Sequence, residues 1–370
     1  MRALPVVQQM LDDPSPLVAG EAAGTIGALA PMIEADPAQE RSSFDNLHQT
    51  LQARTGLPGQ PNDESNATEL RAALVTAMAK LAKANPSVAL EDFSRMVTQD
   101  EQPKTRQAAL LGLASLGENS GAGDVIAREL DPNVEPDPSV RQAAASALGE
   151  IGSMNYAKQL DASSRSQSEP DKQVRDTAFK AFQTLLASPS SQTRELSQWA
   201  DLFGRRRELD REVVVLKTLC QKLQAAKDLQ NLAVEQQRTG EVYLQLNQPA
   251  DAVPYLRQAL AYWEGTHAEP LTMVNLVREM MRALLESGQG REAVRFGEQE
   301  IRRDRANQEE VGPAIRNAVE ILLQKADPAS YRDAALLLQD ALNMSPPLDE
   351  RYREQLQNQR QRLPSTGGNP

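Results

Sequence analysis

Short runs of small apolar residues recur along the first half of the chain, each preceded by a polar segment that contains proline or aspartate. Residues 140–152 read VRQAAASALGEIG, with small residues three or four positions apart. That spacing places the small residues on one face of an α-helix. A residue that is apolar in three of four copies, an arginine and such a run begin at Leu70-Arg71, Thr105-Arg106, Val140-Arg141 and Val174-Arg175, at spacings of 35, 35 and 34 residues. The pattern therefore predicts an internally repeated helical unit.

An earlier copy has Val18 at the apolar position and Ala19 in place of the arginine, 52 residues before Leu70. The additional length matches the insertion RTGLPGQPNDES, residues 54–65. A proline or aspartate ahead of each run predicts a helix start, and alanines let two helices approach closely. Because one such unit cannot bury its apolar face alone, we expect the units to stack on one another.

These units resemble short HEAT repeats, of the kind found in phycobilin lyases and many bacterial scaffold proteins. The resemblance covers residues 1–190 and implies an α-helical solenoid. The segment ALPVVQQMLDD, residues 3–13, resembles the second helix of a repeat whose first helix is missing. Two interpretations stay open. Either a half-repeat caps the array, or the chain is the C-terminal portion of a longer protein, which we favour.

A second period of 41 residues follows, with a shared alanine at Ala252, Ala293 and Ala334. These segments resemble tetratricopeptide (TPR) repeats. The packing positions of that repeat fall at Gly240, Tyr243, Leu256 and Ala259 in the first copy and at Leu338, Ala341 and Pro346 in the third. The second copy departs from the pattern, with Gly297 and Glu300 in those positions. Since the period exceeds the usual 34 residues, the helices should be longer than in an ordinary TPR unit.

Between the two periods, leucines are spaced seven apart at Leu202, Leu209, Leu216 and Leu223, but Arg206 and Lys227 interrupt the alternate positions. Fewer than four clean heptads favour one long packed helix over a coiled-coil dimer. The expected architecture is an all-α helical-repeat solenoid. It has HEAT-like repeats over 1–190, a connecting helix over 191–230, TPR-like repeats over 231–346, and a C-terminal helix and disordered tail over 347–370.

Charge and composition narrow the function class. The formal net charge is −11, which argues against nucleic acid as a ligand and against the activity of HEAT-like DNA glycosylases. The single cysteine excludes a disulfide framework and a thiolate metal cluster. We find no apolar run approaching the roughly 18–20 residues that span a bilayer. Thirty arginines against ten lysines suggest a bacterial genome rich in GC. The compartment stays open, with cytoplasm slightly favoured, because a truncated start would hide a signal peptide.

Candidate catalytic groups are sparse. His48 and His267 are the only histidines, and neither has a histidine, cysteine or acidic neighbour at ligand spacing. The sequence has no phosphate-binding loop and no nucleophile elbow. Cys220 falls on an apolar seam, so we interpret it as a small buried residue rather than a reactive thiol. We therefore expect a protein that is not an enzyme and uses no metal or cofactor.

Charged residues supply the candidate partner-binding sites. Arg205, Arg206 and Arg207 form the densest positive cluster, although the acids that follow at Glu208, Asp210 and Glu212 favour a solvated helix surface. First helices of the TPR-like part would present Gln237, Arg238, Glu241, Arg278 and Arg282 to an extended peptide or protein surface. The recurring arginines of the HEAT-like units, Arg71, Arg106, Arg141 and Arg175, are interpreted as structural, each bridging to a carboxylate of a neighbouring unit.

The first half of the chain is the more acidic, with 25 acidic against 16 basic residues over 1–188. Many of these acids fall between the expected units, at Asp63, Glu64, Asp100, Glu101, Asp131, Glu135, Asp137, Glu169 and Asp171. Loops of a solenoid share one edge, so the sequence predicts an exposed acidic edge. That edge would confer solubility or meet a basic partner.

These features together predict a non-catalytic scaffold or adaptor that binds protein partners, which would be subunits of a larger assembly. The partners would contact a long concave surface, built from second helices of the HEAT-like units and first helices of the TPR-like ones. The alternative is an assembly chaperone or lyase-like factor resembling the bilin lyases, with a chromophore or unassembled subunit on that surface.

Overall fold

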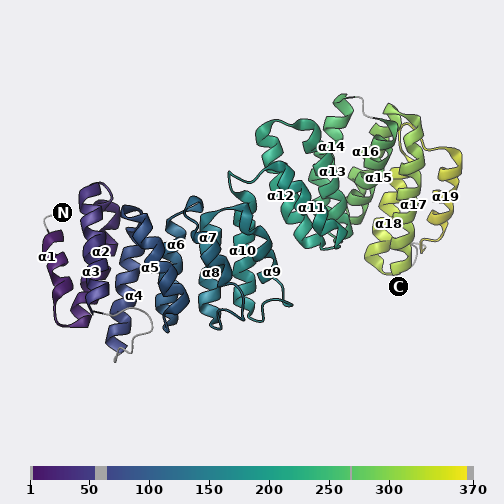
Figure 1. Ribbon diagram of the computed structural model, residues 1–370. Helices are drawn as coiled ribbons and strands as arrows, with labels where there is room; N and C mark the ends of the chain where they lie inside the picture. Colours follow the sequence, from purple (N-terminus) through teal and green to yellow (C-terminus); the bar gives the residue numbers. More distant parts are fainter. Residues whose placement is uncertain (1–2, 55–64, 267–268, 365–370) are drawn as a thin grey trace. The chain divides into compact units, whose positions relative to one another are not determined.

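The computed structural model of the chain describes residues 3–54, 65–266 and 269–364 (Figure 1). These residues form nineteen α-helices and five short 3-10 helices, without a β-strand among them. The prediction of an all-α protein is thus confirmed. The chain divides into two compact units, Met1–Ser191 and Gln192–Pro370.

Unit 1 contains the first ten α-helices. They are α1 (Leu4–Gln9), α2 (Pro16–Ile33), α3 (Pro37–Arg54), α4 (Ser65–Lys80), α5 (Pro86–Gln99), α6 (Pro103–Ser115), α7 (Ala122–Arg128), α8 (Pro138–Ile151), α9 (Ala157–Ser163) and α10 (Lys172–Ala187). The intervening 3-10 helices are η1 (Met10–Asp12), η2 (Ala82–Ala84), η3 (Glu118–Ser120) and η4 (Met154–Tyr156).

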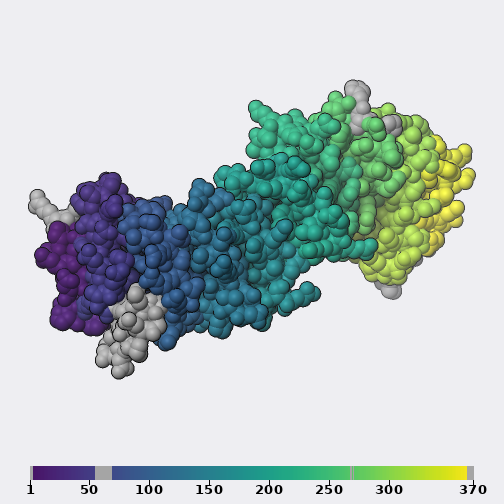
Figure 2. Space-filling view, in the orientation of Figure 1, coloured from purple at the N-terminus to yellow at the C-terminus, as the bar shows by residue number. Residues whose placement is uncertain are grey.

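Alternate helices of unit 1 pack on one another in sequence order: α2 on α4, α4 on α6, α6 on α8, and α8 on α10. Most of these helices begin where the sequence predicts, at a first-turn proline or after a capping aspartate such as Asp171. Small residues allow the close approach, since a Cβ on Gly149 of α8 would lie 3.0 Å from that of Ala181 of α10. Within this unit, the colour in Figure 2 therefore changes steadily from one helix to the next.

The helix α2 corrects the expectation about apolar runs. Over Pro16–Ile33 it is long and apolar enough to cross a membrane by length and composition, and it is the one such helix among the described residues. Seven of its residues, among them Ile26 and Ile33, are buried inside unit 1, where α2 packs against α4 and η1. Packing within the unit thus accounts for one face of α2, while Leu17 and Met32 are exposed.

Unit 2 contains the remaining nine α-helices. They are α11 (Thr193–Arg205), α12 (Leu209–Ala226), α13 (Leu229–Gln245), α14 (Pro249–Thr266), α15 (Pro270–Glu286), α16 (Gly290–Arg303), α17 (Gln308–Lys325), α18 (Pro328–Leu342) and α19 (Glu350–Gln361), with η5 (Arg305–Asn307) ahead of α17. Each helix from α11 to α16 packs against its sequence neighbour, and α15 also contacts α17. At the tightest of these contacts, a Cβ on Gly240 of α13 would lie 2.5 Å from Leu256 of α14.

The single connecting helix expected over 191–230 is wrong, because α11 and α12 occupy this segment and pack against each other. Arg207 adopts the left-handed conformation, with φ of 56°. The backbone N–H groups of Arg207 and Glu208 then donate to the carbonyls of Gly204 and Phe203, each at 3.0 Å, and close the turn. The leucines at heptad spacing therefore belong to two separate apolar faces that meet.

Candidate partner-binding cleft

The recurring arginines of unit 1 form a series of ion pairs that we call the arginine ladder: Arg71 with Asp100 at 2.8 Å, Arg106 with Glu135 at 2.6 Å, and Arg141 with Glu169 at 2.8 Å. In the last two pairs a second guanidinium nitrogen also donates to the other carboxylate oxygen, at 2.8 Å in each case. Bidentate geometry of this kind is the strongest that an arginine and a carboxylate form.

Arg106, Arg141 and Arg175 also hold the loop ahead of their own helices. Arg141 Nη1 donates to the carbonyls of Glu135 and Pro136, both at 2.9 Å. Arg175 does the same to the carbonyls of Glu169 and Pro170, and within the described parts of the chain it pairs with no carboxylate. The ladder thus ties each loop to the next one along the chain and ends at Arg175.

The exposed acidic edge predicted for unit 1 is wrong for three of its acids. Asp100, Glu135 and Glu169 are buried, with exposed fractions of 3%, 2% and 0%, because they are the acceptors of the arginine ladder. The arginine and the carboxylate of each pair are 28 or 29 residues apart in the sequence, so counting charges over a short stretch does not reveal the pairing. Glu101 and Asp131 are exposed as expected, whereas residues 63 and 64 lie outside the described residues.

The cluster Arg205, Arg206 and Arg207 lies at the end of α11 and in the turn to α12, and all three side chains are exposed. Their position follows from the turn, since a left-handed residue cannot continue the helix. None of the three lines the cleft described below.

Two of the arginines predicted to contact a partner are used within unit 2. Arg238 of α13 pairs with Asp201 of α11 at 2.7 Å and with Glu212 of α12 at 2.8 Å. Arg278 of α15 pairs with Glu310 of α17 at 2.6 Å. These side chains therefore link α13 to α11 and α12, and α15 to α17.

The remaining predicted contact residues also have internal partners. Arg282 pairs with Glu286 one turn further along α15, at 2.8 Å. Gln237 Nε2 donates to Glu241 at 3.0 Å and to Glu279 of α15 at 3.5 Å. Burial, together with the neighbouring Glu241 carboxyl, raises the pKa of Glu279 to about 8. This shift favours the protonated form of Glu279, which reduces the repulsion between its carboxyl group and that of Glu241.

The structure also shows the surroundings of Cys220 and His48, which were candidate catalytic groups in the sequence. Cys220 is buried with its Sγ 3.8 Å from Thr239 Oγ1, and burial raises the pKa of its thiol to about 11. A thiol with that pKa is not a nucleophile at neutral pH. His48 Nδ1 lies 2.6 Å from Asp92 Oδ2, while His267 lies outside the described residues. In the part of the chain that the structure describes, no group of three or more metal-ligating side chains converges.

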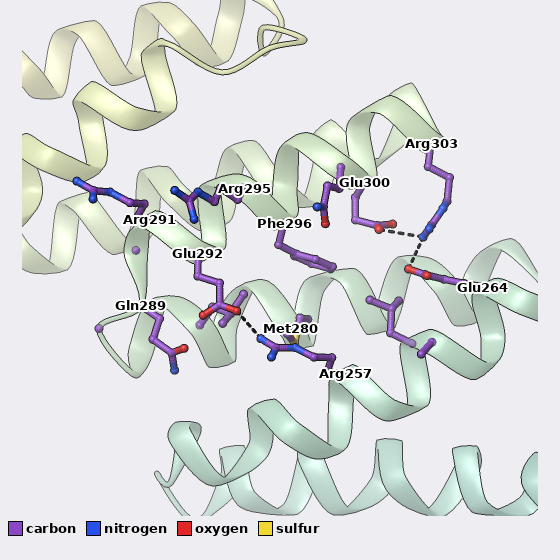
Figure 3. Close-up of a pocket in the computed structure, with 16 residues that line it drawn as sticks. Arg257, Glu264, Met280, Gln289, Arg291, Glu292, Arg295, Phe296, Glu300 and Arg303 are labelled. Atoms are coloured by element: carbon purple, nitrogen blue, oxygen red, sulfur yellow. Dashed lines mark hydrogen bonds and ion pairs between the residues drawn. The ribbon is translucent and has the colours of Figure 1, made fainter.

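A cleft of about 820 Å³ lies between α14, α15 and α16 (Figure 3). Its floor is apolar, formed by the buried side chains of Leu260, Met280 and Leu284. Phe296 of α16 is half-buried and stands over this floor. The walls carry four arginines and three glutamates: Arg257, Arg291, Arg295, Arg303, Glu264, Glu292 and Glu300.

Ion pairs link the two outer helices of the cleft. Arg257 of α14 pairs with Glu292 of α16 at 2.5 Å. Arg303 of α16 pairs with Glu264 of α14 and, at 2.9 Å, with Glu300 on its own helix. Figure 3 shows these pairs at opposite ends of the cleft, with Phe296 between them. The pairs hold α14 and α16 at a defined separation above α15.

Two other arginines line the cleft. Arg291 lies 3.6 Å from Asp340 of α18, a long contact for an ion pair. Arg295 is exposed, and no described residue pairs with it. An apolar floor between charges of both signs suits an extended peptide, whose apolar side chains fill the base and whose polar groups meet the walls.

Sequence reasoning did not single out Arg257, Arg295 or Phe296, because a cleft depends on how three helices converge. One signal was present, however. Glu300 breaks the 41-residue pattern at a position where the other two copies carry alanine, and Glu300 lines the cleft.

Comparisons with known proteins leave the family open. No family model matches the chain, and no curated protein matches it either. Among solved structures, a crystal structure of an engineered protein aligns over 99% of this chain and 100% of its own, with 15% sequence identity and a TM-score of 0.40. At that similarity the alignment supports no conclusion about family or function.

Proposed function

We propose that this protein is a non-catalytic scaffold or adaptor, built as an α-solenoid of HEAT-like and TPR-like units, that binds a segment of a protein partner. The observation that carries the proposal is the cleft of unit 2, where an apolar floor lies between charged walls. Its volume of about 820 Å³ lies within the usual range for ligand sites, about 300–1,000 Å³.

The architecture of unit 1 supports the same proposal. The arginine ladder repeats with the 34- and 35-residue period of the sequence, and alternate helices pack through small buried residues such as Ala145 and Ala181. Arrays that stack identical units in this way present extended surfaces and commonly hold partner proteins. The partner would accordingly be a subunit of a larger assembly.

The charge of the cleft favours a peptide over a small apolar ligand. Arg257 and Glu292 are about half-exposed, at 55% and 47%, and they pair across the opening rather than sealing it. A peptide backbone is polar throughout and therefore tolerates a wall of this kind, while its apolar side chains reach the floor formed by Met280 and Leu284.

The proposal is tested by site-specific photocrosslinking. A photoreactive amino acid replaces Gln299, an exposed residue on the cleft wall, and in a matched protein it replaces Gln230, an exposed glutamine of α13 outside the cleft. Both proteins are irradiated in an extract of the source cells and analysed by mass spectrometry. We expect the photoreactive residue at position 299 to crosslink to one segment of a partner, in an amount nearly equal to that of the protein itself. The photoreactive residue at position 230 should not crosslink to that segment.

A second variant shows whether the apolar contact matters. Phe296→Ala, combined with the photoreactive residue at 299, should reduce the crosslink at least severalfold, since Phe296 stands over the floor of the cleft. Equal labelling from positions 299 and 230, or labelling that is insensitive to the loss of Phe296, would contradict the proposal.

A further inference from the structure

Glu300 occupies a position that the fold assigns to alanine. The corresponding residues of the other two copies, 41 positions away on either side, are Ala259 and Ala341, with exposed fractions of 0% and 1%. Glu300 is equally buried, at 2%. Because an ionisable group in such a place costs stability unless it is fully paired, packing alone does not explain this carboxyl.

The pairing of Glu300 is incomplete. Its Oε1 accepts a hydrogen bond from Arg303 at 2.9 Å, and Arg303 shares its charge with Glu264. Its Oε2 is buried and has no hydrogen-bond partner among the described residues. The side chain lines the cleft (Figure 3). This end of the cleft therefore holds two carboxylates against one arginine, and one buried oxygen of Glu300 lacks a described donor.

The opposite end of the cleft instead carries an excess of positive charge. Arg257 and Glu292 neutralise each other there, and Arg295 is exposed with no described partner. Arg295 and Glu300 are five residues apart on α16, about 7.5 Å along the helix axis. Phe296 lies between them in Figure 3. The cleft is thus positive at one end, apolar in the middle and negative at the other end.

We propose that this cleft recognises an extended segment of a partner protein in which a lysine and an acidic residue are two positions apart. The lysine ammonium would donate to the buried oxygen of Glu300 that lacks a partner, and the acidic side chain would pair with Arg295. This inference rests on the proposed function and names the chemistry of the partner segment.

Three physical arguments select this segment. Residues two positions apart in an extended chain are separated by about 6.6 Å, close to the axial spacing of Arg295 and Glu300, and the long side chains must span the further offset of about 140° around α16. With one carboxylate oxygen already used by Arg303, a single ammonium fits better than a guanidinium, which prefers both oxygens. The methylene stem of the lysine can lie along Phe296 while its charged end reaches Glu300.

The test uses the full chain and synthetic peptides. The probe is a fluorescent nine-residue peptide with lysine, leucine and glutamate at its centre and neutral residues elsewhere, and binding is measured by fluorescence anisotropy. There are three control peptides. In two of them the lysine is replaced, by norleucine or by arginine, and in the third the glutamate is replaced by glutamine. The protein variants are Glu300→Ala, Glu300→Gln and Arg295→Gln, with Arg332→Gln as the matched control, an exposed arginine of α18 outside the cleft.

We expect Glu300→Ala and Arg295→Gln each to weaken binding of the probe roughly tenfold, and Arg332→Gln to leave it unchanged. Both the norleucine peptide and the glutamine peptide should bind the wild-type protein more weakly than the probe does. The affinity of the norleucine peptide should not change further in the Glu300 variants, and that of the glutamine peptide should not change further in Arg295→Gln. Since alanine is the residue of the other two copies, Glu300→Ala should remain folded, which a thermal melt verifies.

Either of two results overturns the inference: no binding of the probe to the wild-type chain at about 1 mM, or equal binding of the lysine and norleucine peptides. A failure of this inference can be distinguished by experiment from a failure of the proposed function. If a partner crosslinks at position 299 but binds Glu300→Ala as well as wild type, the cleft binds protein and the lysine recognition is wrong. If nothing crosslinks there, the proposed function itself fails.

Discussion

Arg141 and Glu169 are joined by two hydrogen bonds of 2.8 Å, although 28 residues separate them in the sequence and both are almost fully buried. The pair connects the start of α8 to the loop ahead of α10, so it fixes the spacing of two packed helices. The same guanidinium holds two backbone carbonyls of its own loop. One side chain thereby bonds polar groups of two loops, among them the buried Glu169 carboxylate, which also accepts from the backbone N–H of Asp171.

Removing this arginine should destabilise unit 1 strongly. Arg141→Ala leaves Glu169 as a buried carboxylate without its cation, which typically costs about 3–5 kcal/mol. Urea unfolding followed by circular dichroism measures the change. The matched control is Arg175→Gln, which removes only hydrogen bonds to two carbonyls and should cost about 1–2 kcal/mol. Equal losses for the two variants would show that the buried ion pair has no special importance.

For the buried carboxyl group of Glu300 in the cleft, we expect its removal to have the opposite effect on stability. Glu300→Ala should raise the thermal stability of unit 2, by about 1–3 kcal/mol, because it removes an incompletely paired buried group while Arg303 keeps Glu264 as a partner. The converse change, Ala341→Glu, places a carboxyl at the equivalent buried position of the third copy and should lower stability. Differential scanning calorimetry of both variants decides the matter. A loss of stability in Glu300→Ala would mean that the carboxyl is structural.

The carboxyl pair of α13 and α15 predicts a dependence of stability on pH. The folded-state pKa of Glu279 is raised from 4.5 to about 8 by burial and by Glu241, so between these values the folded chain binds more protons than the unfolded one. The contribution is fully present below about pH 4.5 and is lost as pH rises towards 8. Stability measured across this window should therefore fall for the wild type.

Glu279→Gln should flatten that fall, because glutamine keeps a hydrogen-bond donor next to Glu241 but does not titrate. Arg278, the nearest cation, pairs mainly with Glu310 and is unchanged in this variant. The control is Glu286→Gln, which alters an exposed pair with Arg282 and should keep the wild-type slope. A slope that persists in Glu279→Gln would place the titrating group elsewhere.

The seam between alternate helices of unit 1 has no room for a large residue. Ala145 of α8 is fully buried, so Ala145→Trp should overpack the contact and cost about 1–3 kcal/mol, which lowers the melting temperature by several degrees. Its neighbour Ser146 is exposed on the same helix, and Ser146→Trp should change stability by less than about 0.5 kcal/mol. Thermal melts of the two tryptophan variants provide the comparison.

Much of the secondary structure could be predicted from the sequence, because the helices of unit 1 carry their own start signals and small-residue faces. The turn at Arg207 could not, since a left-handed residue there is usually glycine and the leucine spacing continued across it. The burial of Asp100, Glu135 and Glu169 was missed because the arginine that pairs with each of them lies 28 or 29 residues away in the sequence. The cleft was missed for a similar reason: Arg257, Phe296 and Glu300 converge only once three helices are packed.

The arginine ladder also makes the length of the array adjustable. Each segment that begins at one arginine and ends just before the next contains both that arginine and its own carboxylate acceptor, so the segment is exchangeable as a whole. Deleting residues 106–140 would bring Arg141 into the place of Arg106 and leave Glu169 as its acceptor, while Asp100 stays with Arg71. Gene duplication or loss of one complete segment therefore preserves every buried charge pair that remains, whereas a cut within a segment orphans one.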